Sequence, residues 1–291
     1  RKPISSQAVP PRVGGVTAFV GRVGRLGLDI LRFWSEAGVT LLDAVGSALA
    51  PGRAAARTVR NVAFRQVYFT GVQGLPAVTI TALILGATLI LQTRVVAPGI
   101  PGEFVGKLIV AVMLRELAPL TTAIIVASRS GTAIATELGN MRANLEVVGL
   151  ASMGIDPARY VVQPRMVGTV VGVLVLTVYF CVLAVAGSLL TAALLSGGPN
   201  IDGVQHGIAD TLGPTDLLLY LVKAGGCGII VGWLCCHFGL QVKNSITEVP
   251  LMSGRAVIRS ILGCVLYSFA VTVSYYAVAS GAFELPTVLP V

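Results

Sequence analysis

Nine charged residues lie within one stretch of this chain that is flanked by long apolar runs. They occupy residues 115–165 and are Arg115, Glu116, Arg129, Glu137, Arg142, Glu146, Asp156, Arg159 and Arg165. A charged side chain at membrane depth costs roughly 3 kcal/mol or more, so such residues usually mark a functional site. Arginine binds phosphate groups with favourable geometry, and a carboxylate can pair with an amine. The segment is therefore the first candidate for chemistry or binding.

The composition indicates an integral membrane protein. Of the 291 residues, 55% are hydrophobic and only 12% are charged, whereas soluble domains carry about 25% charged residues. The mean hydropathy is +0.85. The net charge of +8 comes from basic residues near the ends of apolar runs. That placement indicates membrane orientation, and the aromatic–basic pattern of nucleic-acid binding is absent.

Five apolar runs are long enough to cross a bilayer, so we expect an all-α membrane protein with five spans. The expected spans are about 74–93, 106–135, 158–196, 216–240 and 256–283. From the N-terminus onward, the connections carry ten, two, four, zero, three and zero basic residues. This alternation predicts a cytoplasmic N-terminus and a periplasmic C-terminus. The division into domains is then an N-terminal region, 1–70, and a five-span region, 71–291.

Residues 1–70 have a different pattern. Apolar residues from Phe19 to Leu41 recur at helical spacing, and charged residues from Arg22 to Glu36 recur on another face. We expect an amphipathic helix in the membrane interface, followed by a basic elbow that leads into the first span. A soluble helical subdomain is the alternative.

A short amphipathic helix is expected between the second and third spans. Leu138, Met141, Leu145 and Val148 form an apolar stripe. Arg142 and Glu146 lie four residues apart and would support the polar face. Gly154 suits a helix end, and Asp156-Pro157 suits the next helix start. From these residues alone, an interfacial helix and a docking helix for a cytoplasmic partner are equally supported.

The motifs in this region resemble a known family. The run RELAPLTTAIIVASRSGTAIATELGNMR, followed by MGIDPARYVVQPR, closely resembles the MlaE (YrbE) family of ABC-transporter permeases, the membrane subunits of Mla- and Mce-type lipid transport systems. The similarity is strongest over residues 115–165, and the first 50 residues match only in character. The resemblance implies a homodimer with an N-terminal elbow and five spans, paired with two cytoplasmic ATPase subunits.

The resemblance also implies which residues carry function. The helix at about 139–152 would be the coupling helix that seats in the ATPase. Its candidate contact residues are Glu137, Met141, Arg142, Asn144, Leu145, Glu146, Val148 and Gly149. The family typically carries several acids in this helix, whereas only Glu146 remains in 144–149. This departure indicates a diverged ATPase or a lineage-specific pairing.

A lipid cavity near the dimer axis is implied between the first, second and fifth spans. The candidates for lining it are Arg115, Glu116, Leu89 and Gln92. Arg115 and Glu116 would meet a phospholipid headgroup there. In the alternative interpretation, each of them pairs with a neighbouring span and only locks the bundle. Because adjacent residues point about 100° apart on a helix, the two do not pair with each other.

The expected function is that of a permease subunit moving phospholipid between the bacterial inner membrane and extracytoplasmic MCE-type lipid-binding subunits, in systems that maintain outer-membrane lipid asymmetry. The loop 197–216, with three aspartates, could meet such a partner or simply be solvated. The alternatives are a proton-coupled secondary transporter that uses Glu116, or a membrane scaffold that transports nothing.

The chain is not expected to be an enzyme. Its nearest approach to a P-loop, at 102–108, lacks the required spacing and Ser/Thr. ATP and Mg²⁺ would therefore bind a partner subunit, and no cofactor or metal is expected here.

Overall fold

The structure is a computed structural model that describes residues 56–96, 99–194, 201–243 and 245–279. Within these ranges the regular elements are all helical. The elements are α2 (Ala56–Val96), α3 (Gly102–Leu108), η1 (Ile109–Leu117), α4 (Ala118–Val126), η2 (Ala127–Gly131), α5 (Thr132–Ala143), α6 (Glu146–Ser152), η3 (Ala158–Val162), α7 (Gln163–Leu194), α8 (Ile201–Thr211), α9 (Pro214–Leu240), η4 (Ile246–Glu248) and α10 (Val249–Ala279). η1, η2 and η3 are π-helical, and η4 is a 3₁₀ turn.

The prediction of five spans is confirmed. Five helices are long and apolar enough to cross a membrane: 62–96, 102–143, 160–194, 214–240 and 246–277. The second span is one continuous helix built from α3, η1, α4, η2 and α5. Most of these helices extend past the predicted limits, because residues such as Arg94 and Glu137 continue the helices on which they lie.

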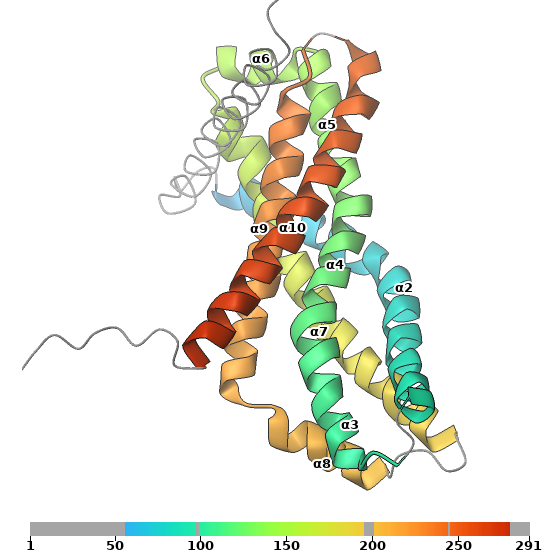
Figure 1. The fold of residues 1–291 in the computed structure, drawn as a ribbon. Coiled ribbons are helices and arrows are strands. Elements are labelled where there is room, and N and C mark those ends of the chain that lie inside the picture. Colours follow the sequence, from blue (N-terminus) through green and yellow to red (C-terminus); the bar gives the residue numbers. More distant parts are fainter. Residues whose placement is uncertain (1–55, 97–98, 195–200, 244, 280–291) are drawn as a thin grey trace, which may run out of the picture.

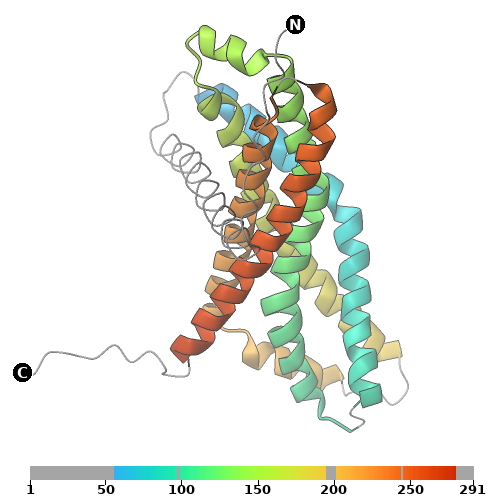
Figure 2. The ribbon, with the colours of Figure 1, turned by 45° about the horizontal axis from the view of Figure 1, so that its top comes forward.

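The bundle is elongated, and its two ends differ (Figure 1). α6 and the start of α10 lie at one end, while α3 and α8 lie at the other, as a second view confirms (Figure 2). α2 packs along α7, and α9 packs against both α7 and α10. The two basic connections, 129–165 and 243–259, therefore reach the same end. We refer to this as the α6 end, and to the opposite one as the α3–α8 end.

Small residues set the contact between α2 and α7. A Cβ atom on Gly86 would overlap the carbonyl oxygen of Ala184, so the two backbones touch. The Ser188 hydroxyl donates a hydrogen bond of 3.1 Å to the carbonyl of Gly86. Gly172 lies against Thr70 in the same seam. Gly86 and Gly172 thus allow two helices of the same chain to pack closely, as small residues do between helices in lipid.

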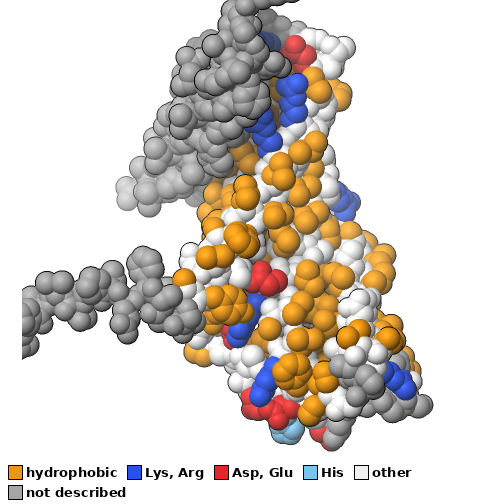
Figure 3. Space-filling view, in the orientation of Figure 1, with side chains coloured by type: hydrophobic (Ala, Val, Ile, Leu, Met, Phe, Trp, Pro, Cys, Tyr) orange, Lys and Arg blue, Asp and Glu red, His pale blue; other side chains and the backbone are white. Residues whose placement is uncertain are grey.

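The outer surface of the described spans is broadly apolar. A band of hydrophobic side chains covers the middle of the molecule, and most charged groups gather toward its ends (Figure 3). On α10, exposed apolar residues recur every three or four positions, at Leu262, Leu266, Phe269 and Val273. Such a surface suits contact with lipid or with another apolar chain.

The predicted amphipathic helix falls in residues 1–55, outside the described residues. The predicted boundary at residue 70 lies inside α2, which begins at Ala56. α2 changes direction along its length (Figure 1) and contains Pro76. A proline inside a helix lacks the N–H that would bond the carbonyl four residues earlier, and this omission commonly bends the helix.

Candidate functional site

The first half of the second span contains a π-helix, η1, which ends with Arg115, Glu116 and Leu117. A π-helical turn contains one more residue than an α-helical turn, and such turns occur frequently at functional sites. Here the wide turn carries two adjacent charged residues, Arg115 and Glu116. They point to different neighbours, so each forms its own ion pair.

The carboxylate of Glu116 contacts side chains from two other spans. The Nζ atom of Lys223, on α9, lies 2.7 Å from Oε1 of Glu116 and donates a further bond of 2.7 Å to the hydroxyl of Thr272, on α10. The Thr272 hydroxyl lies 2.9 Å from the same carboxylate oxygen. Lys223 is fully buried, whereas the side chain of Glu116 is 39% exposed. The buried ammonium is thus neutralised by a carboxylate that still reaches the surface of the protomer.

Arg115 pairs with the start of α9. Its Nε atom lies 2.8 Å from Oδ1 of Asp216. The other carboxylate oxygen of Asp216 accepts a bond of 3.1 Å from the backbone N–H of Gly213, so it caps the helix. On its far side, the guanidinium lies 6.0 Å from the ring centre of Tyr275 on α10. Arg115 therefore connects the second, fourth and fifth spans.

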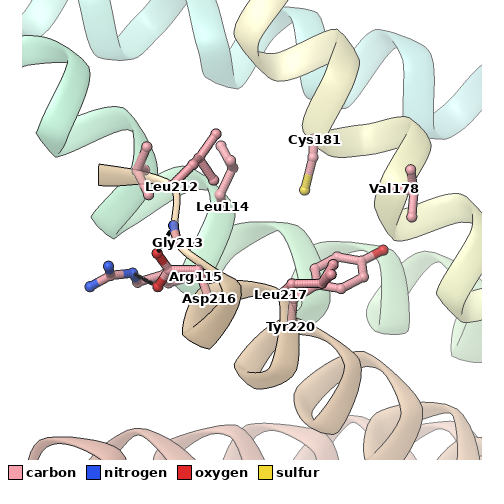
Figure 4. Close-up of a pocket in the computed structure, with 10 residues that line it drawn as sticks. Leu114, Arg115, Val178, Cys181, Leu212, Gly213, Asp216, Leu217 and Tyr220 are labelled. Atoms are coloured by element: carbon pink, nitrogen blue, oxygen red, sulfur yellow. Dashed lines mark hydrogen bonds and ion pairs between the residues drawn. The ribbon is translucent and has the colours of Figure 1, made fainter. Parts of the chain in front are cut away.

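A cavity of about 230 Å³ lies beside the Arg115–Asp216 pair (Figure 4). Its remaining wall is mainly apolar and comes from η1, α7, the segment that joins α8 to α9, and the start of α9. The lining residues are Val110, Leu114, Arg115, Val178, Cys181, Leu212, Gly213, Asp216, Leu217 and Tyr220. Charged groups and an apolar recess thus lie side by side within the spans.

The α6 end carries a second group of charged residues. Glu137, on α5, lies 2.7 Å from Nη2 of Arg165, on α7, and Arg165 is nearly buried. The chain then breaks at Leu145, whose φ of +60° is unusual for a residue other than glycine. α6 begins immediately afterwards, and Leu145, Glu146 and Val148 are exposed around its start. This short helix lies across the end of the bundle (Figure 2).

Comparison with known proteins decides the family. The sequence model of the family described as "Permease MlaE" matches residues 63–274, which include both charged groups and α6. The chain belongs to the MlaE permease family. The match also includes α9 and the Thr272 position on α10, so the whole Glu116–Lys223–Thr272 arrangement lies within the family region.

Individual relatives agree with this assignment. The chain is 26% identical to the intermembrane phospholipid transport system permease protein MlaE of Haemophilus influenzae, over 88% of this chain and 97% of that protein. It is 27% identical to a probable ABC transporter permease protein of Rickettsia felis, over 75% of this chain and 84% of the relative. The chloroplastic protein TRIGALACTOSYLDIACYLGLYCEROL 1 of Arabidopsis thaliana is 26% identical, over 62% of this chain and 51% of its own length.

The structure shows which residues pair with Arg115 and Glu116, two of the four candidates for lining the lipid cavity. Arg115 and Glu116 do pair with neighbouring spans, as in the bundle-locking alternative, yet neither side chain is fully enclosed. Leu89 is buried in an apolar cluster with Met113 of η1, whereas Gln92 is exposed on α2. The four candidates therefore do not form one continuous surface within the protomer.

The sequence reasoning missed three partners. Asp216 was placed at the junction of the loop 197–216 and the fourth span, and neither Lys223 nor Thr272 was considered as a partner; α9 begins at Pro214 and contains both Asp216 and Lys223. Thr272 was not predicted to be a partner of Glu116, because hydroxyl residues are common in spans. The available signal for Asp216 was its position three residues after Gly213, at the start of an apolar run, which is typical of a helix cap. The loop itself holds helix α8.

The expected coupling helix, 139–152, is present in part. A helix does lie between the second and third spans, but the predicted continuous helix is wrong: its first part belongs to α5, and the chain turns at Asn144 and Leu145. The Arg142–Glu146 support is therefore also wrong, and Asn144 contacts Glu146 instead, with a long bond of 3.5 Å. Met141 packs on the core, Arg142 is half-buried, and Gly149 is half-buried in α6.

The predicted end signals after this helix are confirmed. Gly154 adopts a left-handed φ of +76° just after α6, a conformation that glycine tolerates best. The carboxylate of Asp156 accepts a bond of 3.0 Å from the backbone N–H of Ala158, where the third span begins. In the described part of the chain, no three His, Cys, Asp or Glu residues are grouped to hold a metal.

Proposed function

We propose that this chain is the permease subunit of an ABC-type transporter that moves phospholipid between the bacterial inner membrane and an extracytoplasmic lipid-binding partner. The observation that carries the proposal is the charged arrangement inside the spans of an MlaE-family chain, where the exposed side of Glu116 lies next to the buried Lys223. The name of the Haemophilus relative, which describes intermembrane phospholipid transport, supports the choice of substrate.

In this proposal, Glu116 and Arg115 contact the polar part of the lipid. Glu116 remains 39% exposed although Lys223 and Thr272 bond it. A lipid amine could share the carboxylate, and a phosphate could approach the guanidinium of Arg115. Lys223 and Asp216 act as the resting partners, which keep both charges compensated when no headgroup is bound. The network thereby lowers the cost of placing a polar binding site at membrane depth.

The protein works as a homodimer in this proposal. Thr272 places the Glu116 group against α10, and the outward face of α10 carries an apolar stripe. A second copy packed near this face would enclose the exposed side of Glu116 in a shared cavity. The lipid would then be shielded from both bulk water and the surrounding bilayer.

The energy comes from two partner ATPase subunits, which bind ATP and Mg²⁺. α6 is suited to receive their movement because its exposed residues Glu146 and Val148 lie at one end of the bundle. α5 continues directly into the span that carries Arg115 and Glu116. In this proposal the N-terminus and α6 lie in the cytoplasm, and the α3–α8 end and the C-terminus lie in the periplasm, where an MCE-type lipid-binding subunit would exchange lipid.

The decisive test measures ATP-dependent phospholipid transfer by the complete complex in proteoliposomes. Glu116→Gln keeps the shape and the hydrogen-bonding oxygen but removes the charge. We expect transfer to fall at least about tenfold, equivalent to the loss of one charge-assisted hydrogen bond of about 1.5 kcal/mol, with complex assembly unchanged. The matched control is Glu103→Gln, an exposed carboxylate paired with Lys107 at the α3–α8 end.

Two results would contradict the proposal. Unchanged transfer by Glu116→Gln would remove the headgroup role. Lipid transfer driven by a proton gradient without ATP would instead favour a secondary transporter.

The coupling role has its own test. Val148→Asp places a charge on the exposed face of α6 and should reduce copurification of the ATPase subunit. Ile246→Asp is the matched control, since Ile246 is exposed in η4, in the other connection at the same end of the bundle. Equal loss in both variants would argue against a specific docking surface on α6.

A further inference from the structure

The fourth span is shorter than the third at the α3–α8 end. The hydroxyl of Tyr220 donates a bond of 2.8 Å to the carbonyl of Leu174, which fixes the register of α9 on α7. From this hydrogen bond toward the α3–α8 end, α9 extends from Tyr220 only to Pro214, whereas α7 extends from Leu174 to Leu194. At 1.5 Å per residue, α7 extends roughly 20 Å beyond α9. The fourth span therefore leaves part of α7 uncovered.

Helix α8 does not fill this space, because it packs against α3. A Cβ atom on Gly106 would overlap the carbonyl oxygen of Val204, and one on Gly207 would overlap the carbonyl of Glu103. α8 reaches α7 near the end of that helix, where Val204 and Ile208 share an apolar cluster with Ala192. The cavity described above lies between η1, α7 and the start of α9 (Figure 4).

The recess opens toward the outside of the bundle. Val178, Leu212 and Leu217 line it and are each about half exposed or more. They belong to, or directly adjoin, two helices that cross the membrane. When these helices cross a membrane, an opening between them faces the hydrocarbon of the bilayer, so a ligand would enter sideways from lipid.

The carboxylate and the phenol that line the recess are already engaged. One carboxylate oxygen of Asp216 forms the ion pair with Arg115, and the other accepts a hydrogen bond from the N–H of Gly213. The hydroxyl of Tyr220 is bound to Leu174. A charged headgroup would find no unpaired partner on Asp216 or Tyr220, whereas an apolar chain would lose nothing by lying next to them. The volume of about 230 Å³ suits part of one chain rather than a whole lipid.

We infer that this recess holds an acyl chain of a phospholipid, which enters sideways from the half of the bilayer at the α3–α8 end. It lies apart from Glu116, whose proposed headgroup contacts are toward α10, whereas Arg115 lines the recess and is placed to contact the phosphate of the same lipid. The choice of phospholipid, rather than another lipid, rests on the proposed function. The chain would lie along Leu114, Cys181 and Leu217.

Photolabelling tests this inference. The full chain is reconstituted in phosphatidylcholine vesicles that contain phosphatidylcholine with a diazirine at the end of one acyl chain. After illumination, peptide mass spectrometry measures the label at each residue. We expect several-fold more label at Cys181 and Leu217 than at Leu218, which is as exposed as Leu217 but does not line the recess. Equal labelling of all exposed apolar residues would overturn the inference.

Filling the recess provides the matched comparison. Cys181→Trp should lower the label on Leu217 several-fold and leave that on Leu218 unchanged. Val182→Trp changes the adjacent, exposed residue, which does not line the recess, and should alter neither. If Cys181→Trp does not fold, Val178→Trp fills the recess from the same helix. Undiminished label on Leu217 in a folded, filled variant would also overturn the inference.

These measurements need neither ATP nor transport. A labelled recess in a chain that moves no lipid would contradict only the proposed function. A recess that takes no label in a chain that does move lipid would contradict only this inference.

Discussion

The contact between α2 and α7 and the contact among η1, α9 and α10 hold the bundle by opposite means. Between α2 and α7, glycines bring the backbones together and hydroxyl groups supply the polar contacts, such as Ser188 to Gly86. Between η1, α9 and α10, charged side chains span the gap, with Lys223 fully buried. Both contacts lie within one chain and face the same bilayer.

The difference shows which contact exists for more than packing. Small residues and hydroxyls are sufficient to associate helices in lipid. A buried ion pair costs more to assemble, because desolvation offsets most of its attraction. A structure that needed only stability would use the first kind of contact throughout. The charged contact is therefore where we expect function, and the uncharged contact is where we expect a passive scaffold.

The largest effect on stability should follow from removing the carboxylate that pairs with Lys223. Glu116→Leu removes the carboxylate from a fully buried ammonium and should cost about 3–5 kcal/mol of unfolding free energy. Denaturation in detergent measures this loss. The double variant Glu116→Leu with Lys223→Met should recover most of it, although not lipid transfer. A loss below about 1 kcal/mol in the single variant would mean that Lys223 finds another partner.

The scaffold contact should respond to size rather than charge. Gly86→Ala places a methyl group into the carbonyl of Ala184 and should cost up to about 3 kcal/mol, as overpacking does. Gly71→Ala, in the same helix, meets no atom within 4 Å and should cost nothing. Similar stability of the two variants would show that α2 and α7 separate without penalty.

A smaller effect is expected at the hydroxyl that joins the charged contact to α10. Thr272→Val keeps the shape but removes the bonds to Glu116 and Lys223. We expect a loss of about 1.5 kcal/mol, the usual value for a hydrogen bond to a charged group. Thr272→Ser keeps the hydroxyl and serves as the control. If both variants lose equal stability, packing of the methyl group matters more than the hydrogen bonds.

The smallest effect is expected at a hydroxyl pair in the scaffold contact. Tyr179→Phe removes a contact of 3.0 Å to Thr79, whose hydroxyl still bonds the carbonyl of Leu75. Interhelical hydrogen bonds in membranes average about 0.6 kcal/mol, and we expect a loss of that size. Thermal unfolding in the same detergent would measure it. A loss as large as that of Thr272→Val would erase the distinction between the two contacts.

The spans were predictable because their signal is local. Hydropathy and the count of basic residues require only neighbours in sequence, and they identified five helices and a helix at the α6 end. The charged candidates Arg115 and Glu116 were also visible, as isolated charges in an apolar run.

Their partners were not predictable, because they depend on register between distant helices. Lys223 and Thr272 lie 107 and 156 residues from Glu116. Asp216 and Lys223 lie within the predicted fourth span, but the sequence does not show that they pair with Arg115 and Glu116. The break at Leu145 was hidden for a similar reason: leucine favours helices, and only the three-dimensional path of the chain forces a left-handed residue there.

The continuity of the second span has a mechanical consequence. Its 42 residues form one helix from Gly102 to Ala143, which at 1.5 Å per residue is a rod of roughly 63 Å. One end adjoins α6, and the other carries the backbone contact of Gly106 with α8. A displacement of α6 would be transmitted to α8 through this one helix. The helix can bend at its two π-helical segments, η1 and η2, so we expect it to change direction there.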